Sequence, residues 1–180
     1  MLEKLRDKFN KSRVNSCLSM DNRDNFLIAE NATTKQTYIV SNTEKSIDID
    51  NCLEIKNPLS QEINHMSIDG CFLTSQHGYN GEKCDLVVFD NSKFCFVELK
   101  TNAESKKLRS KNLKKARNQL GATINYFDDN DLDFTTHELE AYIILKNKLY
   151  PTDKASIKER RKKFFDEYEV DLLEKSEIVF

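Results

Sequence analysis

The clearest pattern of apolar and polar positions lies between residues 86 and 97. Two apolar runs, Leu86–Phe89 and Phe94–Val97, flank the polar tetrad Asp90–Lys93. Both runs are rich in β-branched and aromatic residues, which favour strands, and a short polar segment between two such runs is typical of a hairpin. The sequence therefore predicts two antiparallel strands joined by a tight turn.

Three charged residues lie at one end of this hairpin. Asp85 opens the first strand, whereas Glu98 and Lys100 close the second. In an antiparallel hairpin the start of one strand lies beside the end of the other, and residues two apart project from the same face. We therefore expect Asp85, Glu98 and Lys100 to form a cluster of two carboxylates and one ammonium group.

The segment before the hairpin predicts a helix, a strand and a connection. Apolar residues recur every three or four positions in Pro58–Met66, which is typical of a short helix with one buried face and with Glu62 on a neighbouring side. Ile68–Leu73 then predicts a strand that contains a glycine. Ser75–Glu82, with two glycines, predicts a flexible connection into the hairpin.

Helical spacing follows the hairpin. Apolar residues at steps of three and four predict a long amphipathic helix over Ser105–Phe127. Beyond an acidic linker, Leu139–Leu145 predicts a buried strand and Ala155–Tyr168 a charged helix, and Ile178–Phe180 forms a strand-like tail.

The first 57 residues carry a different pattern. A short amphipathic helix is predicted around Leu2, Leu5 and Phe9. Strand-like pieces follow at Phe26–Ala29, Thr37–Val40 and Ile47–Ile55. A chain of 180 residues has room for one ordinary domain with a small appendage. We therefore interpret residues 1–57 as a β-rich N-terminal extension and residues 58–180 as the main domain.

Composition indicates a soluble protein. Charged residues make up 32% of the chain and apolar residues 38%, and no apolar run approaches the roughly 18 residues that cross a membrane. The polar start carries no pattern of a signal peptide. We expect a cytoplasmic protein with no membrane contact.

The cysteines support the same compartment. The chain has five cysteines: Cys17, Cys52, Cys71, Cys84 and Cys95. Their number is odd, no two form a C-x-x-C pair, and three of them lie in apolar, strand-like runs. We interpret them as buried reduced thiols. The three histidines are His65, His77 and His137. They lack the spacing of metal ligands, so a zinc site is not expected.

Charge is segregated along the chain, although the net charge is only -2. Basic residues dominate the predicted helix after the hairpin, and an acidic segment follows over residues 128–140. Because these bases follow the carboxylates directly, we expect them to contact phosphate. The candidates are Lys106, Lys107, Arg109, Lys111, Lys114, Lys115 and Arg117. The alternative is a solvated helix face whose charge is balanced by the acidic segment.

Two carboxylates that converge at strand ends are hard oxygen ligands of the kind that Mg²⁺ or Mn²⁺ accepts. Such an ion binds a phosphate oxygen and lowers the pKa of a bound water, and a lysine one strand step away would orient that water or balance charge. The reaction that fits Asp85, Glu98 and Lys100 is hydrolysis of a phosphodiester bond.

These residues resemble the motif of the PD-(D/E)XK nuclease superfamily. Asp85, twelve further residues and then Glu98-Leu99-Lys100, followed by a basic helix with Gln119, are similar to that motif, and the order of elements over residues 58–146 agrees. The resemblance implies an α/β fold in which helices flank a central mixed β-sheet, with a restriction-endonuclease-like core. One departure is that Cys84 replaces the proline of the motif.

Carried over by position, the resemblance implies a role for each residue. Asp85 and Glu98 would be metal ligands together with the backbone carbonyl of Leu99, and Lys100 would be the catalytic lysine. Glu62 on the first helix would add a metal ligand, as an acid does in several branches.

In the branch similar to RecB nucleases, a Gln and a Tyr four residues apart support the site. Gln119 fits this pattern, whereas Tyr126 is seven residues further on and Thr123 occupies the expected place. Asp69 is one more acid near the hairpin, but because Gly70 follows it, a turn or strand-end role is favoured over a role in the site.

We therefore expect a Mg²⁺-dependent (or Mn²⁺-dependent) nuclease that acts on DNA, with RNA as the alternative substrate, within a DNA-processing or defence assembly. The alternative is a non-catalytic nucleic-acid-binding or scaffold subunit with the same fold, and a third class is a protein-interaction module. An ATPase or helicase partner fits the first two hypotheses, and a homodimer would fit double-strand cleavage.

Overall fold

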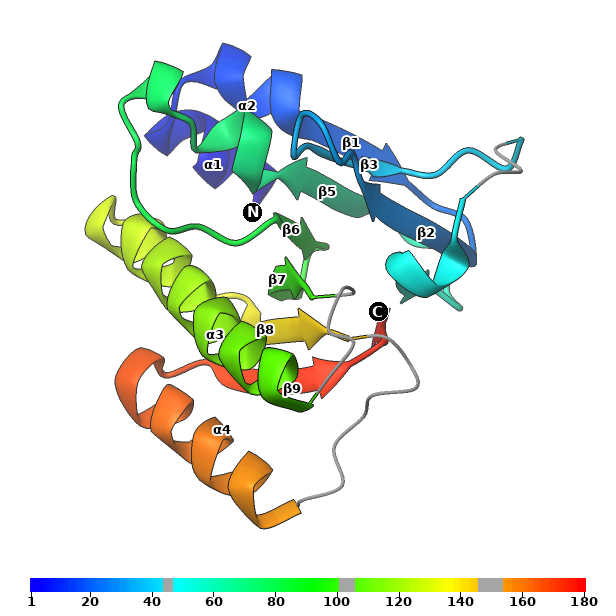
Figure 1. Ribbon diagram of the computed structural model, residues 1–180. Coiled ribbons are helices and arrows are strands. Elements are labelled where there is room, and N and C mark those ends of the chain that lie inside the picture. The colour runs from blue at the N-terminus through cyan, green and yellow to red at the C-terminus, as the bar shows by residue number, and fades with distance from the viewer. Residues whose placement is uncertain (44–46, 101–105, 146–153) are drawn as a thin grey trace.

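The computed structural model describes residues 1–43, 47–100, 106–145 and 154–180, and in them two mixed sheets are flanked by helices (Figure 1). The helices are α1 (Leu2–Lys8), α2 (Lys11–Cys17), α3 (Lys106–Asp129) and α4 (Lys154–Tyr168), with short turns η1 (Ile49–Asn51), η2 (Ile68–Phe72) and η3 (Ser75–His77). The strands are β1 (Leu18–Asp21), β2 (Asn25–Glu30), β3 (Thr37–Ile39), β4 (Leu53–Lys56), β5 (Ile63–Ser67), β6 (Leu86–Phe89), β7 (Lys93–Leu99), β8 (Glu138–Ile144), β9 (Asp171–Lys175) and β10 (Glu177–Val179).

The larger sheet has six strands in the order β1-β5-β6-β7-β8-β9. Neighbours among β1, β5, β6 and β7 pair antiparallel, whereas β7, β8 and β9 run parallel. Parallel neighbours need a long crossover connection. Here α3 lies between β7 and β8, and α4 lies between β8 and β9.

The smaller sheet has four strands in the order β10-β4-β2-β3. Its strands β2, β3 and β4 pair antiparallel, and β10 joins β4 in parallel register with Ile178 opposite Ile55. This sheet therefore combines three strands from the first 56 residues with one from the last four.

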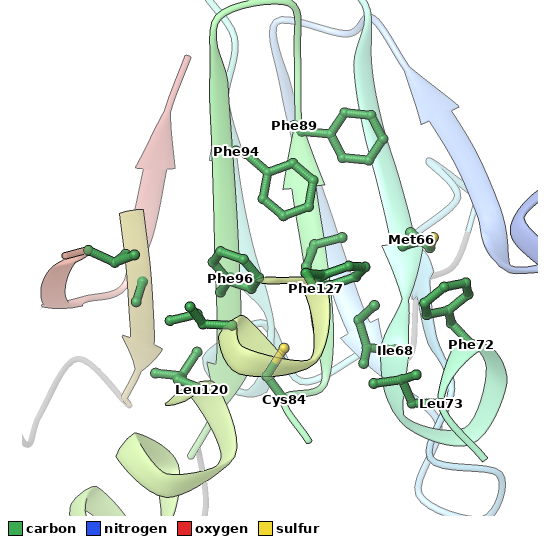
Figure 2. Packing of buried hydrophobic residues seen from close by; sticks show 14 of the residues in the cluster. Met66, Ile68, Phe72, Leu73, Cys84, Phe89, Phe94, Phe96, Leu120 and Phe127 are labelled. Carbon is green, nitrogen blue, oxygen red and sulfur yellow. The ribbon is translucent and has the colours of Figure 1, made fainter. Parts of the chain in front are cut away.

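The six-stranded sheet is covered on both faces. On one face, Val87, Phe94 and Phe96 belong to a core that includes residues of all four helices, which we call the helix-side core (Figure 2). On the other face, Val88 and Val97 pack with residues of β2, β4 and β10 in the sheet-side core. Alternating side chains along β6 and β7 enter the two cores in turn.

Most predicted elements after residue 85 are confirmed. The hairpin is formed by β6 and β7, β8 covers the predicted strand 139–145 except its last residue, and α4 covers the predicted helix 155–168. The long helix is α3, and Ser105, where it was expected to begin, lies outside the described residues. The expected combination of a mixed sheet with flanking helices is present.

The helix predicted over Pro58–Met66 is wrong. Asn57 bonds through its side chain to both the N–H and the carbonyl of Gln61, which closes a turn, and β5 follows. Ile63 enters the sheet-side core and Met66 the helix-side core. A spacing of three places residues on one face of a helix but on opposite faces of a strand, so a strand buried on both faces imitates the helical pattern.

The strand predicted over Ile68–Leu73 is also wrong, because η2 occupies these residues. The N–H groups of Ile68 and Asp69 both donate to the carbonyl of Asp85, and Gly70 has a φ of +70°. A Cβ at Gly70 would lie 2.3 Å from the carbonyl oxygen of Thr34. The chain therefore leaves the sheet at a position that only glycine occupies without strain.

The first 57 residues are joined to both sheets. The expected pieces at 26–29 and 37–40 correspond to β2 and β3, whereas of residues 47–55 only the end becomes a strand, β4. In addition, α2 and β1 were not expected, and β1 pairs with β5 in the six-stranded sheet. Residue 57 as a domain boundary stays a prediction, and strand pairing crosses it in both sheets.

One expectation about the cysteines is corrected. Cys17 at the end of α2 and Cys71 in η2 form a disulfide, with Cα atoms 5.7 Å apart. The other three cysteines, Cys52, Cys84 and Cys95, are buried thiols that form no disulfide, as expected. The helical spacing of α2 and the turn at η2 bring Cys17 and Cys71 together, and neither element was apparent from the sequence.

Within residues 1–43, 47–100, 106–145 and 154–180, no helix is both long and apolar enough to cross a membrane.

We predict that the disulfide stabilises the fold. A cross-link over 54 residues of separation reduces the entropy of the unfolded chain, which corresponds to about 4 kcal/mol at most. Cys17→Ser and Cys71→Ser should each lower the free energy of unfolding in urea by up to this amount, and dithiothreitol should do the same to the wild type. Five reactive thiols in unreduced, denatured protein would contradict the pairing.

We also predict a loss of stability in acid that depends on His65. This residue is 1% exposed, and its ring nitrogens bond to the hydroxyls of Ser19 and Thr37 at 3.0 and 2.9 Å. Burial lowers its pKa from 6.5 to about 4. The unfolded chain therefore binds a proton first as the pH falls, and stability decreases between pH 6.5 and 4 by about 3 kcal/mol.

The pH series of unfolding free energies is measured for the wild type, His65→Gln and His77→Gln. The His65 variant should show a flatter dependence between pH 6.5 and 4, whereas replacement of the exposed His77 should leave the slope unchanged. An equal slope in all three proteins would rule out His65 as the cause.

Candidate active site at the open end of the hairpin

A cleft of about 330 Å³ lies where β6 begins and β7 ends. Its walls come from four places: β2 and the loop after it, η2, the hairpin, and α3. The lining residues are Glu30, Lys35, Asp69, Asp85, Glu98, Leu99, Lys100, Asn112, Lys115 and Gln119. The cleft therefore contains the three charged residues expected at the hairpin together with the predicted Gln119.

Asp85 and Glu98 lie side by side because the hairpin pairing continues beyond β6. The N–H of Asp85 donates to the carbonyl of Val97 at 3.1 Å, and the N–H of Leu99 donates to Asp85 Oδ2 at 2.6 Å. Alternation along the strands places Asp85 on the face of Val87 and Glu98 on the face of Phe96. Both carboxylates thus extend the helix-side face, where apolar packing ends.

Glu98 is fully buried, and only one of its oxygens is paired. Lys100 Nζ donates to Glu98 Oε1, and the Lys100 side chain is 15% exposed. Oε2 of Glu98 is buried without a hydrogen-bond partner among the described residues. A buried carboxylate oxygen without a donor is costly unless a cation or a proton satisfies it.

The electrostatic environment resists ionisation of both acids. Burial raises the pKa of Asp85 from 3.8 to about 7, although the Leu99 N–H and the Lys100 charge act in the opposite direction. Burial, and then the charge of Asp85, raise the pKa of Glu98 well above its usual value. One lysine therefore does not compensate two buried carboxylates.

Two side chains of α3 fix the segment that leads into Asp85. Gln119 Nε2 donates to the carbonyl of Lys83 at 2.9 Å. The hydroxyl of Thr123 accepts the N–H of Cys84 at 2.8 Å and donates to the carbonyl of Gln119 at 3.0 Å. The Oε1 atom of Gln119 is buried and has no hydrogen-bond partner in the described part of the chain.

Tyr126, the tyrosine considered alongside Gln119 on this helix, does not line the cleft. Its ring centroid lies 5.1 Å from that of Tyr79 and 5.9 Å from that of Phe9. Tyr126 therefore belongs to the aromatic packing at the C-terminal end of α3, and Thr123 is the residue that contacts the site segment.

Glu62 is not brought to the cleft. It precedes β5, and β5 runs antiparallel to β6 with Asn64 opposite Phe89 and Ser67 opposite Leu86. Glu62 is thus at the turn end of the hairpin, the opposite end from Asp85. The expectation failed because it depended on a helix that is not formed.

Asp69 also lines the cleft, although a turn or strand-end role was favoured for it. It sits in η2, its N–H contacts the carbonyl of Asp85 at 3.2 Å, and Lys83 Nζ lies 3.6 Å from its Oδ1. The sequence carried a signal for this placement. Asp69 and Gly70 follow a buried segment directly, and a turn at this point places Asp69 beside the start of β6.

The N-terminal segment supplies one wall of the cleft. Glu30 ends β2, and Lys35 in the β2–β3 loop lies with its Nζ 3.7 Å from Glu30 Oε1. Gln36 Nε2 donates to the carbonyl of Gly70 at 2.9 Å, which holds this loop against η2. No local pattern in the sequence indicates this contact.

The basic residues of α3 separate onto three faces. Lys115 lies in the cleft with Asn112 and Gln119, at helical steps of three and four. Lys111 and Lys114 are exposed on the outer face, whereas Arg109 and Arg117 are partly buried and face α4 and β9. Nothing is described of the side chains of Lys106 and Lys107, although α3 includes both positions.

The donor set fits a small, hard divalent cation. Among the described residues, no group of three His, Cys, Asp or Glu side chains is arranged around one point as in a closed metal site. Mg²⁺ commonly uses one or two carboxylates and keeps several waters. The unpaired Oε2 of Glu98 and the uncompensated charge beside Asp85 meet this requirement.

Comparison with protein-family models, with curated proteins and with solved structures gave no match to this chain.

We predict that Asp85 is held in the site at the expense of stability. Burial raises the pKa of Asp85 from its usual value of 3.8 to about 7. Above pH 7 this difference corresponds to a destabilisation of the folded state by at most about 4 kcal/mol. Asp85→Asn should therefore raise the free energy of unfolding at pH 8, and the gain should shrink at pH 4, where the folded wild type is protonated. Asp129→Asn, at an exposed position, should change stability by less than about 0.5 kcal/mol.

Millimolar Mg²⁺ should raise the unfolding midpoint of the wild type but not that of Asp85→Asn, because binding to the folded state alone stabilises it. Both effects are measured by urea unfolding followed by circular dichroism. A destabilised Asp85→Asn variant at pH 8 would show that Asp85 is a structural residue.

Proposed function

We propose that the protein is a metal-dependent nuclease of the PD-(D/E)XK type, with a restriction-endonuclease-like core formed by β5, β6, β7, α3 and β8. The observation that carries the proposal is the juxtaposition of two buried carboxylates and a lysine in one cleft. Support comes from the topology, since the strand that ends in Glu98 and Lys100 is followed by a basic helix and a parallel strand.

Asp85, Glu98 and the backbone carbonyl of Leu99 would hold the Mg²⁺ or Mn²⁺ ion. When bound, the ion supplies Lewis-acid activation of a phosphate oxygen and of water. The protein's own contribution is to position these ligands. The Leu99 N–H fixes one Asp85 oxygen, and Gln119 and Thr123 hold residues 83 and 84 in place.

Lys100 has two tasks in this proposal. Its Nζ pairs with Glu98 Oε1, and it would place a positive charge beside a phosphate bound in the cleft. An ammonium group at this place stabilises negative charge on the phosphate in the transition state. Lys115 at the rim would contact a neighbouring phosphate, because nucleic-acid backbones are held by such contacts.

DNA is the proposed substrate. The exposed Lys111 and Lys114 continue from Lys115 along α3, and such a row of lysines binds a phosphate backbone regardless of sequence. RNA would satisfy the same contacts and is distinguished by experiment. Assembly with an ATPase or helicase, pairing of two copies and a cytoplasmic location remain parts of this proposal that rest on sequence alone.

A non-catalytic nucleic-acid-binding subunit is the second candidate, and one observation favours it. Glu98 is fully buried, and its Oε1 is paired with Lys100. If that ion pair is permanent, the cleft binds phosphate without cutting it. The two candidates differ in whether purified protein hydrolyses nucleic acid when Mg²⁺ or Mn²⁺ is added.

We predict metal-dependent cleavage that requires the three residues at the hairpin end. Supercoiled, linear and single-stranded DNA and RNA are incubated with Mg²⁺, Mn²⁺ or EDTA. Glu98→Gln and Lys100→Ala should each reduce cleavage at least about 100-fold, as is typical when a group that stabilises the transition state is removed, and EDTA should abolish it.

Lys158→Ala, which removes an exposed charge from α4, is the matched control and should cut at the wild-type rate. Circular dichroism verifies that all variants fold. Wild-type rates in both Glu98→Gln and Lys100→Ala would refute the catalytic assignment. Salt-dependent binding of DNA with no cleavage in either metal would establish the non-catalytic candidate instead.

A further inference from the structure

A second basic site lies between α3 and α4, away from the cleft. A groove of about 310 Å³ there is lined by Arg117 and Asn118 of α3 and by Arg160, Lys163 and Tyr168 of α4, with Glu167 at its edge. Gly121 lets the two helices approach, since a Cβ at this position would lie 2.3 Å from the Tyr168 ring. The groove thus results from close packing of two basic helices.

The groove has an excess of positive charge. Glu174 of β9 has a side chain only 2% exposed; Arg160 Nη2 lies 3.2 Å from its Oε1, and Arg109 Nη2 lies 4.0 Å from its Oε2. Arg117 adds a third guanidinium group next to Arg160. One buried carboxylate therefore faces three arginines, and the groove's second carboxylate, Glu167, is exposed.

Several arginine donors in this place are unused. Arg160 donates through Nη1 to Ser156 and through Nη2 to Glu174, but its Nε is buried without a hydrogen-bond partner in the described residues. Arg117 Nη1 is buried and equally unpartnered within those residues. Burial, together with the charge of Arg160, lowers the pKa of Arg117. Buried guanidinium donors without acceptors are unfavourable and favour an added acceptor.

We infer that this groove binds a phosphate group through Arg117, Arg160 and Lys163. Guanidinium groups offer paired N–H donors that match phosphate oxygens, and an ammonium group adds a point charge. A phosphate between Arg117 and Arg160 would offer acceptors to these guanidinium groups and reduce the repulsion between the two side chains. Lys163 lines the groove with a side chain that is 75% exposed, and its Nζ lies 2.9 Å from Oε1 of the exposed Glu159, a solvated ion pair that a phosphate would replace.

This site is distinct from the cleft. Lys115 and Gln119 lie in the cleft, whereas Arg117 between them lies in the groove, so α3 separates the two sites. The exposed Lys114 lies on the helix surface between them. Two sources supply the ligand chemistry: the terminal phosphate of a nucleic-acid strand that lies across α3, or a free phosphate such as that of a nucleotide.

The test measures phosphate binding in EDTA, so its outcome is independent of nuclease activity. Inorganic phosphate is titrated calorimetrically into the full chain at constant ionic strength. The wild type should bind one phosphate, and Arg117→Gln and Arg160→Gln should weaken binding at least tenfold. Lys158→Gln removes an equal charge from an exposed position of α4 that does not line the groove, and this variant should bind phosphate within twofold of the wild type.

Lys163→Gln keeps the inference testable if an arginine variant fails to fold, since a side chain this exposed contributes little to folding. This variant should weaken phosphate binding at least threefold. A wild type that binds no phosphate overturns the inference, and so does equal weakening by Lys158→Gln and Lys163→Gln.

The source of the phosphate is identified with oligonucleotides that do or do not carry a 5′-phosphate and with a nucleoside monophosphate. Tighter binding of the phosphorylated oligonucleotide that is lost in Arg117→Gln supports the site and assigns it to a strand end. Binding of the mononucleotide alone, also lost in Arg117→Gln, supports the site and assigns it to a small molecule. Oligonucleotide and mononucleotide binding that is unaffected by Arg117→Gln overturns the assignment of these residues.

Discussion

Burial of the β6–β7 hairpin on both faces is the constraint on which the structure depends. Alternate side chains of these strands enter the helix-side core and the sheet-side core, so neither face has room for polar groups. Polar chemistry is therefore confined to the ends of the hairpin. At the turn end, Asp90 accepts the N–H groups of Ser92 and Lys93 and closes the loop. At the open end, Asp85 and Glu98 face each other with a single lysine.

The hairpin and the elements after it were predictable because their patterns are local. Runs of β-branched and aromatic residues specify β6 and β7, and a sustained helical period specifies α3. The same local reasoning failed at residues 58–73, where β5 is buried on both faces and loses the alternation that identifies a strand. At Gly70 the chain then turns with a positive φ, and a side chain at this position would clash with the carbonyl of Thr34, which is far away in sequence.

The candidate site was predictable to the extent that it is built from the hairpin. Asp85, Glu98 and Lys100 are joined by strand pairing, whereas Asp69, Glu30 and Lys35 arrive through packing of η2 and the β2–β3 loop. The charge of α3 was visible in the sequence, but its distribution was not. Packing against α4 and β9 directs Arg109 and Arg117 away from the cleft that Lys115 lines and from the outer face that carries Lys111 and Lys114.

The parallel pairing of β10 with β4 has a consequence for the order in which the protein is built. Residues 53–56 are synthesised early, but their partner strand, Glu177–Val179, leaves the ribosome after every strand of the six-stranded sheet. Until then one edge of β4 has no neighbour, and an unpaired edge attracts other chains. The sheet that covers the hairpin and supplies one wall of the cleft is therefore the last part of the described fold to be completed.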